Sequence, residues 1–356
     1  MSEQLFSPVN LAGTILSNAM VMAPMTRNRA PDNIPNDLMV EYYSQRASAG
    51  LIISEGAQIS EEAVGYPATP GIYSDTHIAG WKKVTDAVHA HGGHIFCQLW
   101  HCGRVSHPDF HQGELPVAPS AIQPKGDAFT FEGLKPFVTP RALELHEIPT
   151  LIRQYVHAAQ AAIAAGFDGV EIHSANGYLL DQFLRDGSNQ RRDKYGGSYE
   201  NRSRLLLEII AAMSEAIGSE RIGVRLSPVN GFNDMHDTNP QPLFNYVATA
   251  LSECNLAYLH VVEVSMQGEP SKSFDIKQLR QCYQGTYIAN GGYDKVRAES
   301  ALAAGDAELI AFGVPFIANP DLPQRLRNNV DLATPDATTF YGGDAHGYTD
   351  YPNATL

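Results

Sequence analysis

The chain has 356 residues, of which 44% are apolar, and it carries a formal net charge of −14 at pH 7. This acidic balance disfavours nucleic acid and anionic membranes as partners, because both repel negative charge. The sequence has no apolar run near the roughly 20 residues that a membrane-spanning helix needs. Its first residues, MSEQLFSPVNL, lack the basic and apolar regions of a signal peptide. A cytoplasmic enzyme is therefore expected.

Apolar runs that are typical of strands alternate with helical patterns along the chain. The expected strands are Val21–Ala23, Leu51–Ser54, His94–Leu99, Gly169–His173, Ile222–Leu226, Tyr258–Val262, Thr286–Ala289 and Leu309–Phe312. The expected helices are Leu38–Ala49, Asp75–His91, Ile148–Ala165, Glu200–Ile217, Gln241–Cys254, Phe274–Cys282, Lys295–Ala304 and Pro320–Asn328. Glycines suited to left-handed helix caps follow several of them, at Gly50, Gly92, Gly166, Gly218 and Gly305. This alternation predicts an α/β fold in which a parallel sheet closes into a single (β/α)8 TIM barrel.

Three segments fall outside this repeat. Residues 4–18 have the pattern of a short N-terminal hairpin, which would plug the floor of the barrel. Residues 103–147 form a long insertion after the third strand, and an insertion of that length is usually functional or a lid. The tail from Leu332 is polar and carries aromatic residues beside glycines. Because no linker separates these segments, residues 1–356 are expected to form a single domain.

Polar side chains gather at the end of the fourth expected strand. The run FDGVEI leads into His173 and Asn176, which can donate hydrogen bonds to an oxygen, and then into the phenol of Tyr178. Catalytic residues of α/β barrels lie at the carboxyl ends of the strands. A polar loop with a satisfied histidine is the plainer explanation, but it does not account for three polar residues that converge on one strand end. The pattern therefore predicts an active site here.

Other strand ends offer groups that suit a large, flat, phosphorylated cofactor. Gln98 and Thr26 would satisfy ring carbonyls and amides, and Arg225 would balance negative charge on a reduced ring. Glycine turns at residues 291–292 and at 313 follow the last two strands, where barrels hold phosphate with backbone N–H groups. Each signal is weak alone, and the prediction rests on their falling on one face of one barrel.

Four motifs, APMTR, QLWHCGR, HSANGYLLDQFL and FIANPDL, carry a resemblance to a known family. From about Leu5 to its end, the chain resembles the old yellow enzyme family, most closely the bacterial N-ethylmaleimide and nitrate-ester reductases. The resemblance implies a barrel that binds FMN non-covalently and takes hydride from NADPH or NADH. It implies transfer of that hydride to an activated alkene, such as an enone, maleimide or nitroalkene. Nitrate esters and nitro compounds are further candidate substrates.

The resemblance also assigns roles to single residues. Tyr178 matches the proton donor, and His173 and Asn176 match the pair that hydrogen-bonds the oxygen of the substrate. The flavin-binding positions are Pro24, Met25, Thr26, Ala57, Gln98 and Arg225 at the ring, and Gly291, Gly292, Gly313 and Val314 at the phosphate. The residues that would shape the substrate pocket above the flavin are Trp100, Tyr66 and Tyr341.

The chain departs from the family at one flavin-binding position. The family commonly has GRPFIANPDL, whereas this chain reads GVPFIANPDL, with Val314 in place of the arginine that usually contacts the phosphate. The departure affects how tightly the cofactor is held rather than whether the fold holds one. Lys272 and Arg297 are the basic residues that would fill the gap.

Three other classes of protein would leave different signals in the sequence. A barrel lyase or aldolase would need a Schiff-base lysine at a strand end, and none of the expected ends carries one. A zinc hydrolase built from His101, Cys102, His107 and His111 would lack an HExxH motif and a carboxylate partner, so no metal site is expected. A non-catalytic flavin-binding protein would keep the phosphate turns without needing the polar trio of the fourth strand end.

The cysteines bear on the source of electrons. Cys97, Cys102, Cys254 and Cys282 form no CxxC pair, so reduced thiols are expected. A dienoyl-CoA reductase of the same superfamily would carry a cysteine cluster and a second dinucleotide domain, and this sequence shows neither. Electrons are therefore expected to come directly from free nicotinamide. The sequence leaves open the choice between NADPH and NADH, the natural substrate and whether the protein is a monomer or a homodimer.

Overall fold

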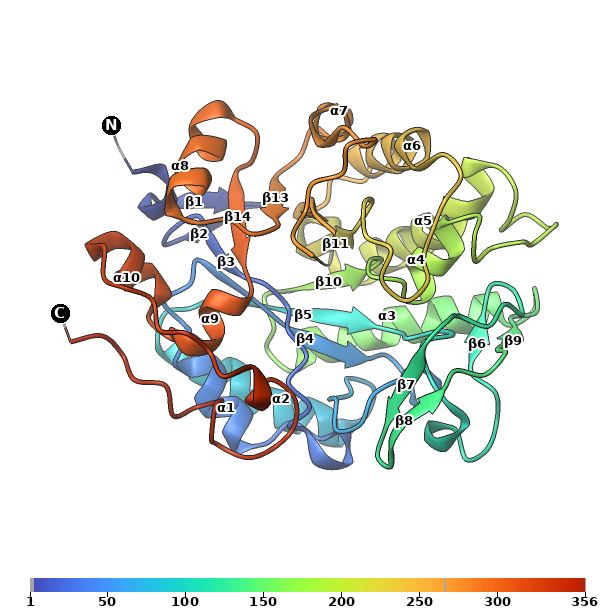
Figure 1. The fold of residues 1–356 in the computed structure, drawn as a ribbon, viewed down its shortest axis with the longest axis horizontal. Helices are drawn as coiled ribbons and strands as arrows, with labels where there is room; N and C mark the ends of the chain where they lie inside the picture. The colour runs from blue at the N-terminus through green and yellow to red at the C-terminus, as the bar shows by residue number, and fades with distance from the viewer. Residues whose placement is uncertain (1–2, 266, 356) are drawn as a thin grey trace.

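A closed barrel of eight parallel strands forms the centre of the computed structural model, which describes residues 3–265 and 267–355. The strands are β3 (Met20–Met22), β4 (Leu51–Gln58), β5 (Ile95–Trp100), β10 (Gly169–His173), β11 (Ile222–Leu226), β12 (Tyr258–Val262), β13 (Tyr287–Asn290) and β14 (Leu309–Phe312). Each strand pairs with the next, and β14 pairs back onto β3, which closes the barrel (Figure 1). The predicted TIM barrel is confirmed.

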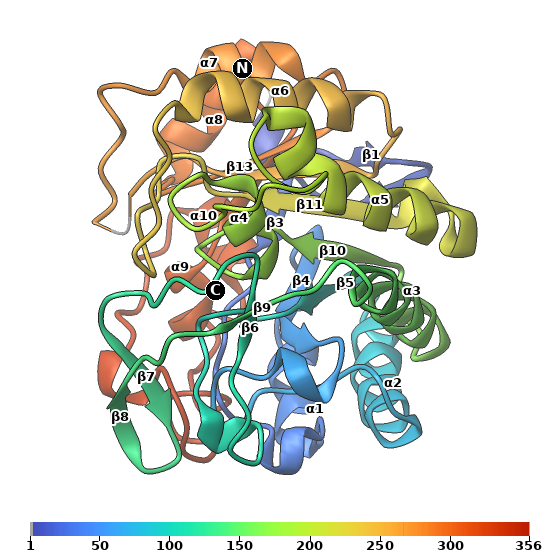
Figure 2. The same cartoon turned by 90° about the vertical axis from the view of Figure 1, so that its right-hand side faces the viewer.

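Helices follow the strands and surround the barrel (Figure 2). They are α1 (Asp37–Ser44), α2 (Asp75–Ala90), α3 (Ile148–Ala164), α4 (Leu179–Leu184), α5 (Tyr199–Ile217), α6 (Pro240–Ser252), α7 (Ile276–Cys282), α8 (Lys295–Ala304), α9 (Val314–Ala318) and α10 (Leu322–Asn328). Side-chain caps begin several of them, since Ser74, Ser198 and Asp294 accept a hydrogen bond from the first turn. None of the helices in the described part of the chain is long and apolar enough to cross a membrane.

The structure corrects several details of the sequence-based prediction. The short helices α4 and α9 were not predicted, because five or six mostly apolar residues give no clear helical period. Helix α1 ends at Ser44, not at Ala49. Gly50 does not adopt the expected left-handed cap. It is needed instead because a side chain there would overlap the backbone carbonyl of Asn18.

The N-terminal segment forms the expected hairpin, in which β1 (Val9–Leu11) pairs antiparallel with β2 (Thr14–Leu16). Leu5, Leu11 and Leu16 are buried in the main core. Because the hairpin leads directly into β3, it lies at the amino end of that strand, on the floor of the barrel.

The insertion after β5 carries regular structure of its own. Strands β6 (Val117–Ala118) and β9 (Arg141–Ala142) form a small parallel pair, and β7 (Asp127–Thr130) and β8 (Gly133–Pro136) form an antiparallel hairpin. Figure 1 shows this hairpin projecting from the barrel. It brings Phe129 of β7 to the wall of the main cavity.

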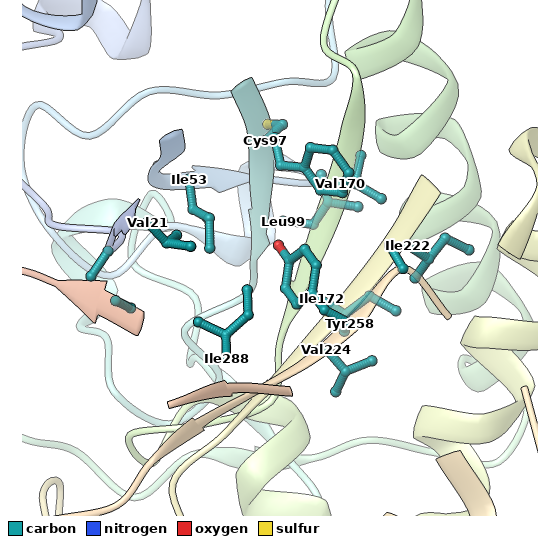
Figure 3. Close-up of a cluster of buried hydrophobic side chains, with 14 of the residues drawn as sticks. Val21, Ile53, Cys97, Leu99, Val170, Ile172, Ile222, Val224, Tyr258 and Ile288 are labelled. Atoms are coloured by element: carbon teal, nitrogen blue, oxygen red, sulfur yellow. The ribbon is translucent and has the colours of Figure 1, made fainter. Parts of the chain in front are cut away.

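Alternate residues of each barrel strand point outward to the helices or inward to the barrel axis. Val170 and Ile172 of β10 belong to the apolar core shown in Figure 3, together with Val224 of β11. Glu171 and His173 alternate with these residues along β10, so their side chains point to the opposite face of the strand. This alternation lets one strand serve both the core and a polar interior.

Candidate active site

A cavity of about 550 Å³ opens at the carboxyl ends of the barrel strands. It is lined by Pro24, Met25, Thr26, Arg27, Asn28, Tyr66, Gln98, Trp100, Phe129, His173, Asn176, Tyr178, Arg225, Phe232, Val314, Ile317, Phe340 and Tyr341. Most residues that the sequence assigned to the cofactor or the substrate therefore meet in one place. Of the described residues so assigned, Ala57, Gly291, Gly292 and Gly313 do not line this cavity.

His173 and Tyr178 stand side by side at the end of β10. Their ring centroids are 5.0 Å apart, with the rings at 74° to each other. Burial, Arg225 and His260 together hold the pKa of His173 well below its ordinary value, so its imidazole is neutral and donates from one nitrogen. Burial also raises the pKa of Tyr178 well above its ordinary value, so its phenol keeps its proton. The pair presents two neutral donors to the cavity.

Asn176 lies on the loop between β10 and α4 in a left-handed backbone conformation, with φ of 55°. Its backbone N–H donates to the Ser227 hydroxyl over 2.7 Å, which fixes the loop against the end of β11. Its side-chain Oδ1 accepts a hydrogen bond from Nδ2 of Asn230 over 3.0 Å. Because the oxygen is occupied in this way, the NH2 group of Asn176 remains to bind a ligand in the cavity.

An aromatic wall adjoins this polar group. Tyr66 stacks on Trp100 with ring centroids 5.5 Å apart, and Trp100 meets Tyr178 edge to face at 4.9 Å. The Tyr178 hydroxyl donates to the Tyr66 hydroxyl over 3.1 Å. Gly56 of β4 has no room for a side chain, because one would overlap the Trp100 indole. That glycine therefore makes space for the wall of the pocket.

Gln98 and Arg225 supply polar groups to another part of the cavity wall. Nη2 of Arg225 donates to Oδ1 of Asn290 over 3.2 Å. Its Nε is buried and has no hydrogen-bond partner among the described residues, and the same holds for Nδ1 of His173. Buried polar groups normally have partners. A flat ligand with ring oxygens and nitrogens would satisfy Nε of Arg225, so this wall fits a flavin ring, and Nδ1 of His173 is left for a second ligand.

The segment after β3 supplies Pro24, Met25 and Thr26 to the cavity. Ala57 is fully buried within β4, next in sequence to the glycine beneath Trp100. Strand β4 runs four residues beyond its predicted end at Ser54, and its register with β5 shifts between Ile53 and Gly56. Beyond the shift, Ala57 pairs with Leu99 of β5 in the barrel wall.

The predicted phosphate turns follow β13 and β14. Gly291 and Gly292 have positive φ values of 147° and 63°, which residues with side chains rarely adopt. The backbone N–H groups of Gly292 and Gly313 donate to no acceptor among the described residues. Val314 lines the cavity and is 53% exposed. The N–H groups left over at these turns fit a phosphate.

The arginine nearest to the first of these turns is Arg297 of α8. Its Nη1 donates to the backbone oxygens of Gly291 over 2.6 Å and of Gly292 over 3.4 Å. Its guanidinium also lies over the Tyr293 ring, 4.0 Å from the centroid. Two basic residues were named as replacements for the missing arginine. Arg297 contacts the turn at Gly291 and Gly292. Lys272 makes no hydrogen bond or ion pair with this turn among the described residues.

Contacts between distant parts of the chain bring the C-terminal tail to the cavity. Nε of Arg27, which is buried, donates to the backbone oxygen of Phe340 over 2.8 Å, and Nη2 donates to that of Gly347 over 2.9 Å. Tyr348 stacks on Tyr42 of α1 with centroids 4.1 Å apart. The tail thereby places Phe340, and Tyr341 at 64% exposure, at the rim of the pocket.

Sequence reasoning missed several residues of this site. Phe129 and Phe340 lie in the insertion and the tail, whose unusual length and aromatic content were the available signals. Phe232 and Asn230 lie in the loop after β11, which gave no signal. The histidines of the insertion are held by local contacts. His111 contacts the Ser106 hydroxyl over 2.8 Å, and His107 accepts from the N–H of Asp109. No metal-binding cluster of three or more ligand side chains occurs in residues 3–265 and 267–355.

Comparisons with known proteins agree with this geometry. The sequence model of the NADH:flavin oxidoreductase / NADH oxidase family matches residues 4–333. A probable flavin mononucleotide-dependent alkene reductase of Leishmania infantum is 44% identical, with 98% of this chain and 97% of that protein covered. The structure of morphinone reductase N189A in complex with tetrahydroNAD is 49% identical, with a TM-score of 0.95 and 99% and 98% coverage. An old yellow enzyme homologue from Zymomonas mobilis is 43% identical, with a TM-score of 0.95 and 99% and 100% coverage.

The fold, the cavity and these likenesses define an FMN-dependent oxidoreductase of the old yellow enzyme type that uses a nicotinamide nucleotide as electron donor. The chain belongs to the NADH:flavin oxidoreductase / NADH oxidase family.

Proposed function

We propose that this protein is an ene-reductase. NADPH or NADH would reduce a bound FMN, and the electrons would then reduce an enone, maleimide or nitroalkene. The observation that carries the proposal is the convergence of three uncharged donors, His173, Asn176 and Tyr178, on one cavity. Bound FMN would accept hydride and pass it on. The chain supplies binding, orientation and a proton.

His173 and Asn176 would bind the oxygen that is conjugated to the alkene. Hydride addition at the β-carbon builds negative charge on that oxygen, and donors fixed in advance stabilise the charge as it develops, by ~3–4 kcal/mol for each donor. The neutral state of His173 and the bond from Asn230 to Asn176 support this role, because both keep an N–H group available.

Tyr178 would give the proton that the α-carbon needs. Its raised pKa supports this role, because a phenol that has lost its proton could not donate one. A positioned general acid contributes about 10²–10⁴-fold to a rate. The Tyr66 hydroxyl, which accepts a hydrogen bond from the Tyr178 hydroxyl over 3.1 Å, keeps the phenol oriented between turnovers. Trp100, Tyr66 and Tyr341 would shape the pocket around the substrate.

The ring of FMN would be held by Pro24, Met25, Thr26, Ala57, Gln98 and Arg225, and its phosphate by Gly291, Gly292, Gly313 and Val314. The orphaned Nε of Arg225 and the N–H groups left over at the glycine turns support this placement. We propose one FMN-binding unit over residues 1–356, of which residues 1, 2, 266 and 356 lie outside the described part of the chain.

Anaerobic stopped-flow spectroscopy tests the proposal. We expect purified protein to be yellow, to bleach with NADPH or NADH, and to regain its colour when cyclohexenone is added without oxygen. A panel of enones, nitroalkenes and nitrate esters would then rank the substrates. A colourless protein would contradict flavin binding. A protein that bleaches but is reoxidised by no member of the panel would contradict alkene reduction.

A further inference from the structure

A layer of polar residues fills the barrel interior directly beneath the cavity. Glu171 of β10 is in register with Gln98 of β5, and Arg225 of β11 is in register with His260 of β12. Glu171 and His260 are fully buried, and neither lines the cavity. The roles proposed above leave both residues unused, although a buried ionisable pair is costly to maintain.

An aromatic layer closes the barrel below these polar residues. Phe96 and Tyr258 face each other with centroids 5.6 Å apart. They fit because Gly169 and Gly223 have no side chains to occupy the same space. The polar layer therefore lies between this aromatic floor and the cavity.

Glu171 connects the residues of the polar layer. Its Oε1 accepts a hydrogen bond from Nε2 of Gln98 over 2.8 Å, and its Oε2 lies 2.8 Å from Nδ1 of His260. Burial by itself would raise the pKa of Glu171, but His260, Arg225 and Gln98 together lower it, so Glu171 is a carboxylate. Burial lowers the pKa of His260, so His260 is neutral and its Nδ1–H donates to Glu171. One buried negative charge thus faces the guanidinium of Arg225.

These contacts fix the direction of the Gln98 amide. Because its NH2 group is bound to a carboxylate, which only accepts hydrogen bonds, its carbonyl oxygen is the end left for the cavity. Gln98 therefore presents an acceptor, and Arg225 presents donors and a positive charge. A flavin ring has both an N–H group and carbonyl oxygens on its pyrimidine side, and the two residues together match it.

We propose that Glu171, held by His260, is a positioning residue for the flavin ring: it turns the Gln98 oxygen toward the ring and offsets the charge of Arg225. This inference rests on the proposed function. Reduction would add negative charge to a ring held by Gln98 and Arg225, and the buried carboxylate of Glu171, which is bound to Gln98, would oppose that charge. Glu171 thereby keeps the bound flavin from being reduced too easily, which preserves the driving force for passing electrons on to an alkene.

The test is the two-electron midpoint potential of the bound flavin, measured by spectral titration against a reference dye. Glu171→Gln keeps the shape and removes the charge. We expect the equilibrium to shift at least tenfold toward reduced flavin, which equals a rise of about 30 mV for two electrons. Reduction by nicotinamide should become more favourable, and alkene reduction should slow. Glu308→Gln is the matched control, because Glu308 pairs with Arg280 at the opposite end of the barrel. The flavin bound to this variant should have the same potential as in the wild type.

A second pair of variants covers the case in which Glu171→Gln does not fold. His260→Asn keeps a donor near the position of Nδ1 and should leave the potential close to that of the wild type. His260→Leu removes the donor and leaves the effect of burial less opposed, so the pKa of Glu171 should rise and the potential should shift in the same direction as in Glu171→Gln. Flavin-loaded variants of Glu171 and His260 with unchanged potentials would overturn the inference. A wild-type protein that binds no flavin would overturn the proposed function itself.

Discussion

Asn230 donates its side-chain amide to Oδ1 of Asn176 over 3.0 Å, and this single hydrogen bond decides which end of Asn176 faces the cavity. The two residues are 54 positions apart and come from the loops after β11 and β10. Oδ1 of Asn230 accepts from the N–H of Phe232 over 2.9 Å, so the amide of Asn230 is itself fixed by its own loop.

Replacing Asn230 with Asp should therefore turn Asn176 around. The carboxylate keeps the bond to Phe232 but can only accept from Asn176, whose NH2 group would leave the cavity. We expect binding of a phenol such as p-hydroxybenzaldehyde to weaken by roughly 10–150-fold, since a hydrogen bond to a charged group is worth ~1.5–3 kcal/mol. Titration of the long-wavelength absorbance band of the complex measures this. Unchanged affinity would mean that Asn176 does not donate to the ligand.

Substituting Tyr178 with Phe should separate the two half-reactions. A phenol that acts only as proton donor is not needed when nicotinamide reduces the flavin, so that rate should stay nearly intact. Alkene reduction should slow by about 10²–10⁴-fold, and nitroalkenes, whose anions persist without immediate protonation, should suffer less. Tyr66→Phe removes the neighbouring hydroxyl that orients the phenol but keeps the donor itself, so alkene reduction should slow far less than in Tyr178→Phe. Equal losses in both half-reactions would reassign Tyr178 to cofactor binding or structure.

Removing His173 and Asn176 together should cost less than the sum of the single losses. Both donors would point at one oxygen, so their effects should couple. We expect His173→Ala and Asn176→Ala each to weaken the binding of phenols and enones and to lower turnover. Stopped-flow reoxidation and the phenol absorbance band give both quantities. A double variant that binds p-hydroxybenzaldehyde as tightly as the wild type would refute the oxygen-binding role.

Buried neutral histidines should make the protein sensitive to acid. Burial and the nearby His111 lower the pKa of His101 to about 3, whereas an unfolded chain binds the same proton near pH 6.5. Between these values the unfolded state holds one more proton, so stability is lost as pH falls from about 6.5 to about 3. His101→Asn keeps an acceptor for the N–H of Gly103. As the pH is lowered across this window, the unfolding free energy of the wild type should fall by about 1.4 kcal/mol more for each pH unit than that of His101→Asn. Urea titrations at several pH values check the slope, and equal slopes would contradict a neutral buried His101.

Introducing Arg at Val314 should slow the release of FMN. The phosphate would otherwise rest on backbone N–H groups of the two turns, while Arg297 is engaged by the carbonyl oxygens of Gly291 and Gly292. A new charged hydrogen bond is worth ~1.5–3 kcal/mol, or roughly 10–150-fold in a dissociation constant. The rise of free-FMN fluorescence on dilution, at low and high salt, measures release. Val296→Arg adds the same charge at a position that is 75% exposed on α8, and it should change little. If both variants release FMN at the wild-type rate, Arg297 or packing already fulfils the role.

The sequence predicted the barrel because its signals are local. The alternation of apolar runs with helical patterns gave the eight strands, and β10, β11, β12 and β14 have the predicted bounds. The trio of His173, Asn176 and Tyr178 was visible for the same reason, since all three lie within six consecutive residues at the end of one strand. Short helices such as α4 were missed, because six residues carry too little periodicity to stand out.

The direction in which each polar atom points was settled only by the tertiary structure. Whether Asn176 shows its oxygen or its NH2 group depends on Asn230, and the orientation of Gln98 depends on Glu171, 73 residues away. Phe340 reaches the pocket because Arg27, 313 residues earlier in the chain, binds its backbone oxygen. A sequence by itself determines which donors and acceptors are available. Which of them meet is decided by folding, because a hydrogen bond depends on distance and angle between groups that the chain brings together from far apart.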